Sequence, residues 1–148
     1  MADDQEPLLG RVELGTLRPV TEAAIDALRA IPPGTLVRFE IVKTTGNIRR
    51  LAWYWVMLKI AVENLADRFD GPVNAKMLHK WLKVRFGLSK PVRSKKTGEV
   101  IGYDEGSIAF NRLPENERAL YINDAVGFLA DQLGTTPDTL RGEAQRAA

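Results

Sequence analysis

Residues 49–66 are the most constraining segment of the sequence, because apolar side chains fall on nearly every side of the helix expected there. Leu51 and Trp55 share one stripe at helical spacing. Trp53 and Tyr54 point in other directions, since successive residues step by about 100° around a helix. A helix that is apolar nearly all round must be covered on more than one side. We therefore expect a sheet to cover one side of this helix and a partner subunit to cover another.

The remaining periodicity predicts a single α+β domain over residues 12–134, in which a small, mainly antiparallel sheet is packed by three long helices and a basic hairpin. Residues 1–11 are expected to be a disordered N-terminus, and residues 135–148 a frayed C-terminal tail with one turn after Pro137. Helix caps, turn residues and apolar periodicity set the expected elements. They are strands at 12–17 and 36–43, helices at 22–30, 49–66, 74–86 and 114–134, a turn at 44–47, a hairpin with arms 91–93 and 100–103, and an extended piece at 107–110.

Composition favours a soluble protein. Of the 148 residues, 45% are hydrophobic and 27% are charged, which is ordinary for a globular domain. Residues 1–6 are acidic where a secretory signal would be basic, and no apolar run approaches the length of a membrane-spanning helix. We therefore expect a cytoplasmic protein that has no membrane partner.

Few side chains in the sequence suit catalysis. The chain has no cysteine, which excludes a disulfide framework and thiolate chemistry, and its one histidine, His79, is flanked by Lys80. Neither the spacing of a zinc site nor a phosphate-binding or dinucleotide-binding glycine pattern is present. We expect a protein that is not an enzyme and holds no cofactor or metal.

One enzymatic alternative rests on carboxylates. Asp67, Asp70, Asp104 and Glu105 lie on either side of a basic segment, and two-metal nucleases combine clustered carboxylates with a cationic DNA-binding surface. Such residues are more often solvated turn residues, and Asp70 with Gly71 is typical of a turn. A metal-dependent nuclease is therefore kept as an alternative.

The distribution of charge is more informative than the net charge of +2. Residues 1–37 have a balance of −3, residues 38–98 a balance of +10, and residues 99–148 a balance of −5. The stretch 76–96 contains eight Lys or Arg and no Asp or Glu. A positive block between acidic flanks indicates a polyanionic partner, although lysines also serve solubility alone.

Nucleic acid is the polyanion that this block suits best. Each neutralised phosphate releases counterions, so several Lys and Arg supply affinity without sequence recognition. On the predicted helix 74–86, Lys76, Lys80 and Lys83 form a stripe opposite the apolar arc. Trp53, Trp81 and Tyr103 could stack on bases or pack in the core. The candidate DNA-binding residues are Arg49, Arg50, Lys76, Lys80, Lys83, Lys90, Arg93, Lys95 and Lys96, with Trp53 or Tyr54 closing a dimer or stacking a base.

Three runs of residues resemble the NinB family of phage and prophage recombination mediators. They are residues 47–55, residues 78–83 and residues 107–110, in the order of a strand–helix–strand unit followed by helices. The resemblance implies a homodimer that binds single-stranded or gapped DNA and assists recombinase loading, with host single-strand-binding protein as a further partner. Gly46 stands where the family commonly has an arginine, so Arg49 or Arg50 would have to replace that contact.

Changing Lys80, Lys83 and Lys96 together to Ala is expected to weaken DNA affinity strongly and to leave the melting temperature nearly unchanged. Titration of a labelled oligonucleotide and thermal unfolding measure the two quantities. Unchanged affinity would remove these residues from the site. A further alternative, an adaptor or inhibitor that presents its basic face to an acidic host protein, predicts little or no salt-dependent DNA binding.

Overall fold

The computed structural model describes residues 4–41, 48–106, 108 and 113–148, and within them it shows an α+β protein. The strands form two separate antiparallel pairs, β1 with β2 and β3 with β4, where the sequence predicted one small sheet. The elements in chain order are β1 (Gly10–Glu13), β2 (Thr16–Pro19), α1 (Glu22–Arg29), α2 (Ile48–Leu65), the short 3-10 helix η1 (Ala66–Arg68), α3 (Ala75–Arg85), β3 (Ser89–Arg93), β4 (Val100–Glu105), α4 (Glu115–Leu133) and α5 (Pro137–Ala147).

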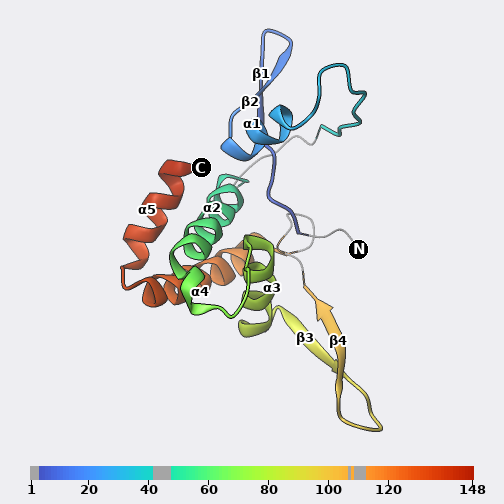
Figure 1. The fold of residues 1–148 in the computed structure, drawn as a ribbon, viewed down its shortest axis with the longest axis vertical. Helices are drawn as coiled ribbons and strands as arrows, with labels where there is room; N and C mark the ends of the chain where they lie inside the picture. The colour runs from blue at the N-terminus through green and yellow to red at the C-terminus, as the bar shows by residue number, and fades with distance from the viewer. Residues whose placement is uncertain (1–3, 42–47, 107, 109–112) are drawn as a thin grey trace.

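Helix α2 lies at the centre of the fold and packs against α3, α4 and α5 (Figure 1). Its buried residues include Leu51, Trp53, Tyr54 and Trp55, which point in different directions as the sequence requires. The expectation that a sheet covers this helix is wrong, because three helices of the same chain cover it instead. Within the described residues, none of the helices is long and apolar enough to cross a membrane.

The C-terminal helix α5 corrects the expectation of a frayed tail. Gly134, with φ of 69°, ends α4 in the left-handed conformation that glycine tolerates best. Thr136 then caps α5 by accepting a hydrogen bond from the Thr139 backbone N–H. Leu140 and Ala144 are buried against α2 and α4, so this helix is part of the core.

The N-terminal third departs most from its sequence pattern. The strand expected at 12–17 is a hairpin, because Leu14 and Gly15 both take positive φ and turn the chain. Helix α1 has the expected bounds and the Thr21 cap. The strand expected at 36–43 is wrong over residues 36–41, which are exposed and irregular, and the rest of it lies outside the described residues, as does the turn at 44–47.

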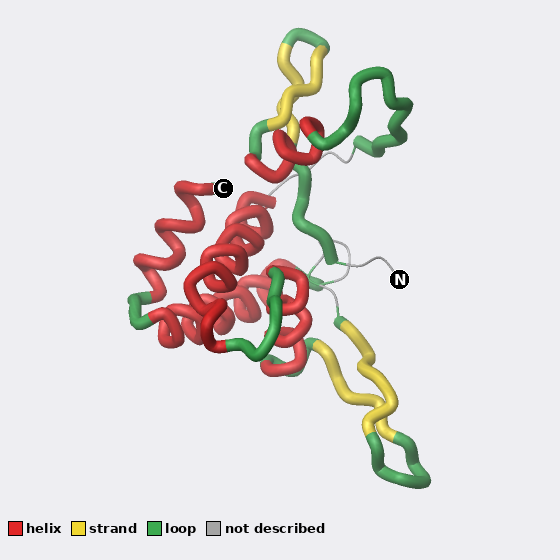
Figure 2. Tube along the Cα trace, in the orientation of Figure 1, coloured by secondary structure: helices red, strands yellow, loops and turns green. Residues whose placement is uncertain are grey.

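The middle of the chain matches its prediction closely. Helix α3 begins after the Asn74 cap and the β3–β4 hairpin follows it directly. This hairpin projects from one end of the helical body, and β1 and β2 project from the other end (Figure 2). Of the extended piece expected at 107–110, the structure describes Ile108, which is buried. Two of the three helices expected to be long, α2 and α4, span 18 and 19 residues, and α3 spans 11.

Replacing Leu140 with Ala is expected to lower the free energy of unfolding by about 2–5 kcal/mol, because it removes a buried leucine and leaves a cavity between α5 and α2. Gln145→Ala on the exposed side of the same helix is the matched control and is expected to change stability by less than about 0.5 kcal/mol. Chemical denaturation measures both. Equal effects of the two changes would show that α5 contributes nothing to the core.

Candidate nucleic-acid interface

Helix α3 presents to solvent a face that mixes cationic and apolar side chains. Its buried residues are Leu78, His79, Leu82 and Lys83. The sequence pattern predicted an apolar arc of Met77, Leu78, Trp81 and Leu82 instead. The helix is turned so that two polar residues enter the core and two apolar ones leave it. The exposed α3 face consists of Lys76, Met77, Lys80, Trp81, Val84 and Arg85.

Lys83 is 4% exposed, so its expected place on an open lysine stripe is wrong. Its ammonium nitrogen lies 3.2 Å from Oδ2 of Asp4 and donates a hydrogen bond of 2.8 Å to the carbonyl oxygen of Gly106. A buried ammonium needs such partners because burial removes its hydration. Lys83 therefore joins the N-terminal segment to the loop after β4 instead of facing solvent. The expectation that changing Lys80, Lys83 and Lys96 together leaves the melting temperature nearly unchanged is wrong for Lys83.

A chain of buried hydrogen bonds continues from Asp4 into the core. The Asp4 carboxylate lies 2.8 Å from Nε2 of His79, Nδ1 of His79 lies 2.7 Å from the Tyr54 hydroxyl, and that hydroxyl lies 2.8 Å from the hydroxyl of Tyr121. Burial lowers the pKa of His79, against the opposing effect of the Asp4 carboxylate. A neutral His79 donates from Nε2 to Asp4 and accepts at Nδ1 from Tyr54, which in turn accepts from Tyr121.

The two aromatic residues expected to close a dimer or to stack on a base lie in the core of this chain. Trp53 is 7% exposed and Tyr54 is fully buried. Burial raises the pKa of Tyr54 and of Tyr121, so both hydroxyls stay protonated and serve as hydrogen-bond donors. The structure thus places Trp53 and Tyr54 where neither a partner subunit nor DNA reaches them.

The two arginines at the start of α2 differ in their surroundings. Arg50 forms an ion pair with Glu115 at the start of α4, and Glu115 also pairs with Arg118. Arg118 is buried and donates to the carbonyl oxygens of Ile108 and Leu113. Arg50 therefore belongs to a structural cluster, whereas Arg49 is exposed. Helix α2, which carries both arginines, begins at the end of the helical body nearer α1 (Figure 1).

The tip of the β3–β4 hairpin displays Lys95 and Lys96 on an ordered turn. The Ser94 hydroxyl oxygen accepts from the backbone N–H groups of Lys96 and Thr97 at 3.2 and 3.3 Å. Gly98, with φ of 75°, donates its N–H to the Ser94 carbonyl oxygen at 2.8 Å. The turn is set by its own sequence, because serine and glycine supply the hydroxyl acceptor and the positive φ.

Four of the predicted site residues lie exposed on this hairpin, and they are Lys90, Arg93, Lys95 and Lys96. Strand β3 contacts α3, and Lys76 and Lys80 lie on the exposed face of that helix. Among the described residues, Lys80, Lys95 and Lys96 form no ion pair with a carboxylate. We call Lys76, Lys80, Lys90, Arg93, Lys95 and Lys96 the basic surface.

The sequence left open whether Trp81 stacks on bases or packs in the core, and the structure shows it half exposed on α3. Trp81 is 48% exposed and its ring lies against Phe128 of α4, with ring centroids 5.4 Å apart. The Arg85 guanidinium lies 4.2 Å from the centroid of Phe128 and 5.6 Å from that of Trp81. The spacing of Trp81 and Arg85, four residues apart on one helix, is the signal that could have found this pair.

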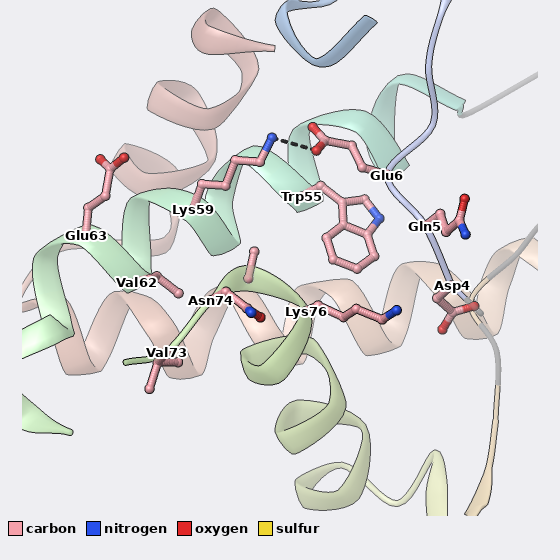
Figure 3. Close-up of a pocket in the computed structure, with 11 residues that line it drawn as sticks. Asp4, Gln5, Glu6, Trp55, Lys59, Val62, Glu63, Val73, Asn74 and Lys76 are labelled. Carbon is pink, nitrogen blue, oxygen red and sulfur yellow. Dashed lines mark hydrogen bonds and ion pairs between the residues drawn. The ribbon is translucent and has the colours of Figure 1, made fainter. Parts of the chain in front are cut away.

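An acidic segment crosses α2 and the start of α3. We call residues 4–9 the acidic arm. Glu6 lies 2.5 Å from the ammonium of Lys59, and a cavity of about 530 Å³ lies below the arm (Figure 3). Its lining includes Trp55 and Lys59 of α2, Lys76 of α3 and residues 4–6 of the arm. The residues expected to form a disordered N-terminus thus contact the helical body from Asp4 onward.

The four carboxylates considered for a nuclease do not form a metal-binding cluster within the described residues. Asp67, Asp70 and Asp104 are exposed, and Glu105 is at the end of β4. Within the part of the chain that the structure describes, no group of three or more His, Cys, Asp or Glu is placed to hold a metal ion. The described residues therefore give the nuclease hypothesis no site.

Comparison of the chain with protein-family models, with curated proteins and with solved structures gives no match. The resemblance to the NinB family therefore remains a prediction from the sequence.

Lys83→Met is expected to lower the free energy of unfolding by about 1.5–3 kcal/mol, because it removes hydrogen bonds between a buried charge and both Asp4 and Gly106. Lys80→Met, three residues earlier on the exposed face of the same helix, is the control and is expected to change stability by less than about 0.5 kcal/mol. Urea denaturation measures both. Equal free energies of unfolding for the two variants would show that Lys83 is exposed to solvent.

Acidification from pH 7.5 to 5.5 is expected to destabilise the fold through His79. Its folded-state pKa lies below the unfolded value of about 6.5, so the unfolded chain binds the extra proton and stability falls as pH drops. Tyr54 and Tyr121, which also face His79, stay neutral over this range because burial raises the pKa of both hydroxyls. His79→Gln should flatten the pH dependence of the urea midpoint, and an unaltered slope would contradict the assignment.

Proposed function

We propose that this chain is a non-catalytic DNA-binding protein whose basic surface holds the phosphates of single-stranded or gapped DNA. The observation that carries the proposal is the β3–β4 hairpin, which projects from the helical body with four exposed cations (Figure 1). A projecting basic hairpin can reach a phosphate backbone without rearrangement of the core. Each phosphate that it neutralises adds affinity through counterion release.

The exposed α3 face extends this basic surface. Lys76 and Lys80 add two exposed cations on α3, the helix that strand β3 of the hairpin contacts. Trp81 beside them and Tyr103 on β4 are each about half exposed, which suits stacking on unpaired bases. These two aromatics replace Trp53 and Tyr54 in the proposal, and Lys83 and Arg50 leave it because they hold the fold together.

A role as a recombination mediator of a phage or prophage belongs to the same proposal. It rests on the resemblance of residues 47–55 and 78–83 to the NinB family. That role requires binding without turnover. Host single-strand-binding protein is the partner that such a role requires.

A homodimer is also proposed, with the interface moved from α2 to the N-terminal third. Helix α2 needs no partner subunit, because helices of its own chain bury it. Residues 8–41 instead expose many large apolar side chains around the β1–β2 hairpin, and a two-stranded hairpin is only marginally stable alone. These side chains are Leu8, Val12, Leu14, Leu17, Val20, Leu28, Ile31, Leu36, Val37, Phe39 and Ile41.

Lys95→Ala with Lys96→Ala is expected to weaken binding of a single-stranded oligonucleotide about tenfold or more at low salt and to lower the salt slope by about 1–2. Fluorescence anisotropy over a series of salt concentrations measures both quantities. The melting temperature should not change, because both side chains are exposed. Arg29→Ala with Arg146→Ala removes the same charge from exposed positions elsewhere and should leave affinity nearly unchanged.

The same titration separates the alternatives. No binding, or binding that is indifferent to salt, would favour the adaptor that meets an acidic host protein. Magnesium-dependent loss of the oligonucleotide that Asp67→Asn or Asp104→Asn abolishes would favour the nuclease. Equal affinity of the lysine variant and the arginine control would remove the hairpin from the interface.

Phe39→Asp is expected to convert a dimer into a monomer, because it places a charge among the exposed apolar side chains of residues 8–41. Light scattering of the wild type and the variant measures the mass. Glu40→Gln, next to Phe39, is the control, because it changes an exposed polar residue and should leave the dimer intact. A monomeric wild type would refute this interface.

A further inference from the structure

The acidic arm meets the helical body through opposite charges. The Asp4 carboxylate lies 2.8 Å from Nε2 of His79 and 3.2 Å from the Lys83 ammonium, and it accepts from the Ile108 backbone N–H at 3.4 Å. Two residues later, the Glu6 carboxylate lies 2.5 Å from the Lys59 ammonium. The arm thus brings two carboxylates to two lysines of α2 and α3.

These contacts have the chemistry of a phosphate-binding groove. Two ammonium groups, a ring N–H and a backbone N–H converge on carboxylate oxygens, and the same donors bind phosphate oxygens. Lys76, which lines the cavity below the arm, adds a third ammonium to this region (Figure 3). The carboxylates of the arm therefore stand where a polyanion would place its charges.

The cavity below the arm contains an unused donor. Trp55 is 4% exposed, and its indole Nε1 is buried without a hydrogen-bond partner among the described residues. A buried donor without an acceptor is unfavourable and marks a place where a ligand atom or a rearrangement would stabilise the protein. Figure 3 shows this indole between the arm and the start of α3.

Only part of the arm is held at the protein surface. Residues 4–9 have no regular secondary structure, and Gln5 and Leu8 are exposed, whereas the Asp4 side chain is 4% exposed and anchors the arm. The Glu6–Lys59 pair is at the surface, where salt and competing ions weaken such contacts. At the far end, the carbonyl oxygen of Leu9 accepts from the N–H of Val20 at 2.9 Å, so an arm that leaves remains tethered at the β1–β2 hairpin.

We propose that the acidic arm is an internal competitor of nucleic acid, whose Glu6 carboxylate occupies the groove lined by Lys59 and Lys76 until single-stranded DNA displaces it. Asp4 anchors the arm on His79 and Lys83. The proposal rests on the proposed function and adds its regulation. The incoming strand places phosphates on the lysines and a nucleotide in the cavity beside Trp55. The groove then extends the basic surface along α3 toward the start of that helix.

Two arm variants test this proposal by titration with a fluorescent oligo-thymidylate. Asp4→Asn with Glu6→Gln removes both carboxylates, and Glu6→Gln alone keeps the buried hydrogen bonds of Asp4 in case the double variant is unstable. The double variant is expected to bind about fivefold or more tightly than the wild type, because the apparent Kd falls as the fraction of open sites rises. Glu6→Gln alone should also bind the oligo-thymidylate more tightly than the wild type does.

Asp124→Asn with Asp131→Asn is the charge-matched control, since both residues are exposed on α4. It should bind like the wild type if the gain comes from the arm and not from net charge. Equal gains in the arm variants and in this control would overturn the proposal and leave DNA binding in place. Failure of the wild type and of every variant to bind would refute the proposed function itself.

A label on the arm reports its displacement directly. The chain has no cysteine, so Gln5→Cys gives a single attachment site for a spin label at an exposed position. Saturating oligo-thymidylate should raise the mobility of this label, and the same label at Gln145→Cys on α5 should not respond. An immobile arm label in a complex shown to be saturated by anisotropy would overturn the displacement.

Discussion

Burial of the aromatic and apolar side chains of α2 on several sides of the helix is the constraint on which the rest of the structure depends. Its tryptophans and Tyr54 point in different directions, so no single sheet or helix can cover them. Helices α3, α4 and α5 provide the cover, which makes the C-terminal segment part of the core and leaves both hairpins outside it. The apolar side chains of α2 are thus covered within this chain, and the hairpins and the exposed α3 face remain open to solvent.

A second consequence is the orientation of α3. The Tyr54 hydroxyl is fully buried in α2 and needs a hydrogen-bond partner, and His79 of α3 supplies it. Turning His79 inward also turns Lys83 inward, since residues four apart lie on one helix face. Asp4 then neutralises the buried ammonium and fixes the arm. One buried hydroxyl thus determines which cations of α3 remain available to a ligand.

The remaining exposed cations lie on the β3–β4 hairpin and on α3, and different contacts hold these two elements in place. Those of the hairpin stand on a turn fixed by Ser94 and Gly98, whereas Lys80 stands on a helix packed against the core. The lysines near the arm meet carboxylates from the same chain. The protein therefore combines exposed cations on the hairpin and α3 with lysines that are paired by its own acidic residues.

The sequence alone determined the elements whose signals are local. Thr21 and Asn74 cap their helices, Gly134 ends α4, and the residues around Gly98 form a hairpin, because caps and turns depend on neighbours in the chain. Burial was decided by contacts between distant residues. Lys83 is inside because Asp4 reaches it, Trp81 is half outside although it is apolar, and α5 is a core helix because α2 needs its cover. The alternation over residues 36–41 gives no strand for the same reason, since a strand requires a neighbour and this chain places none beside it within the described residues.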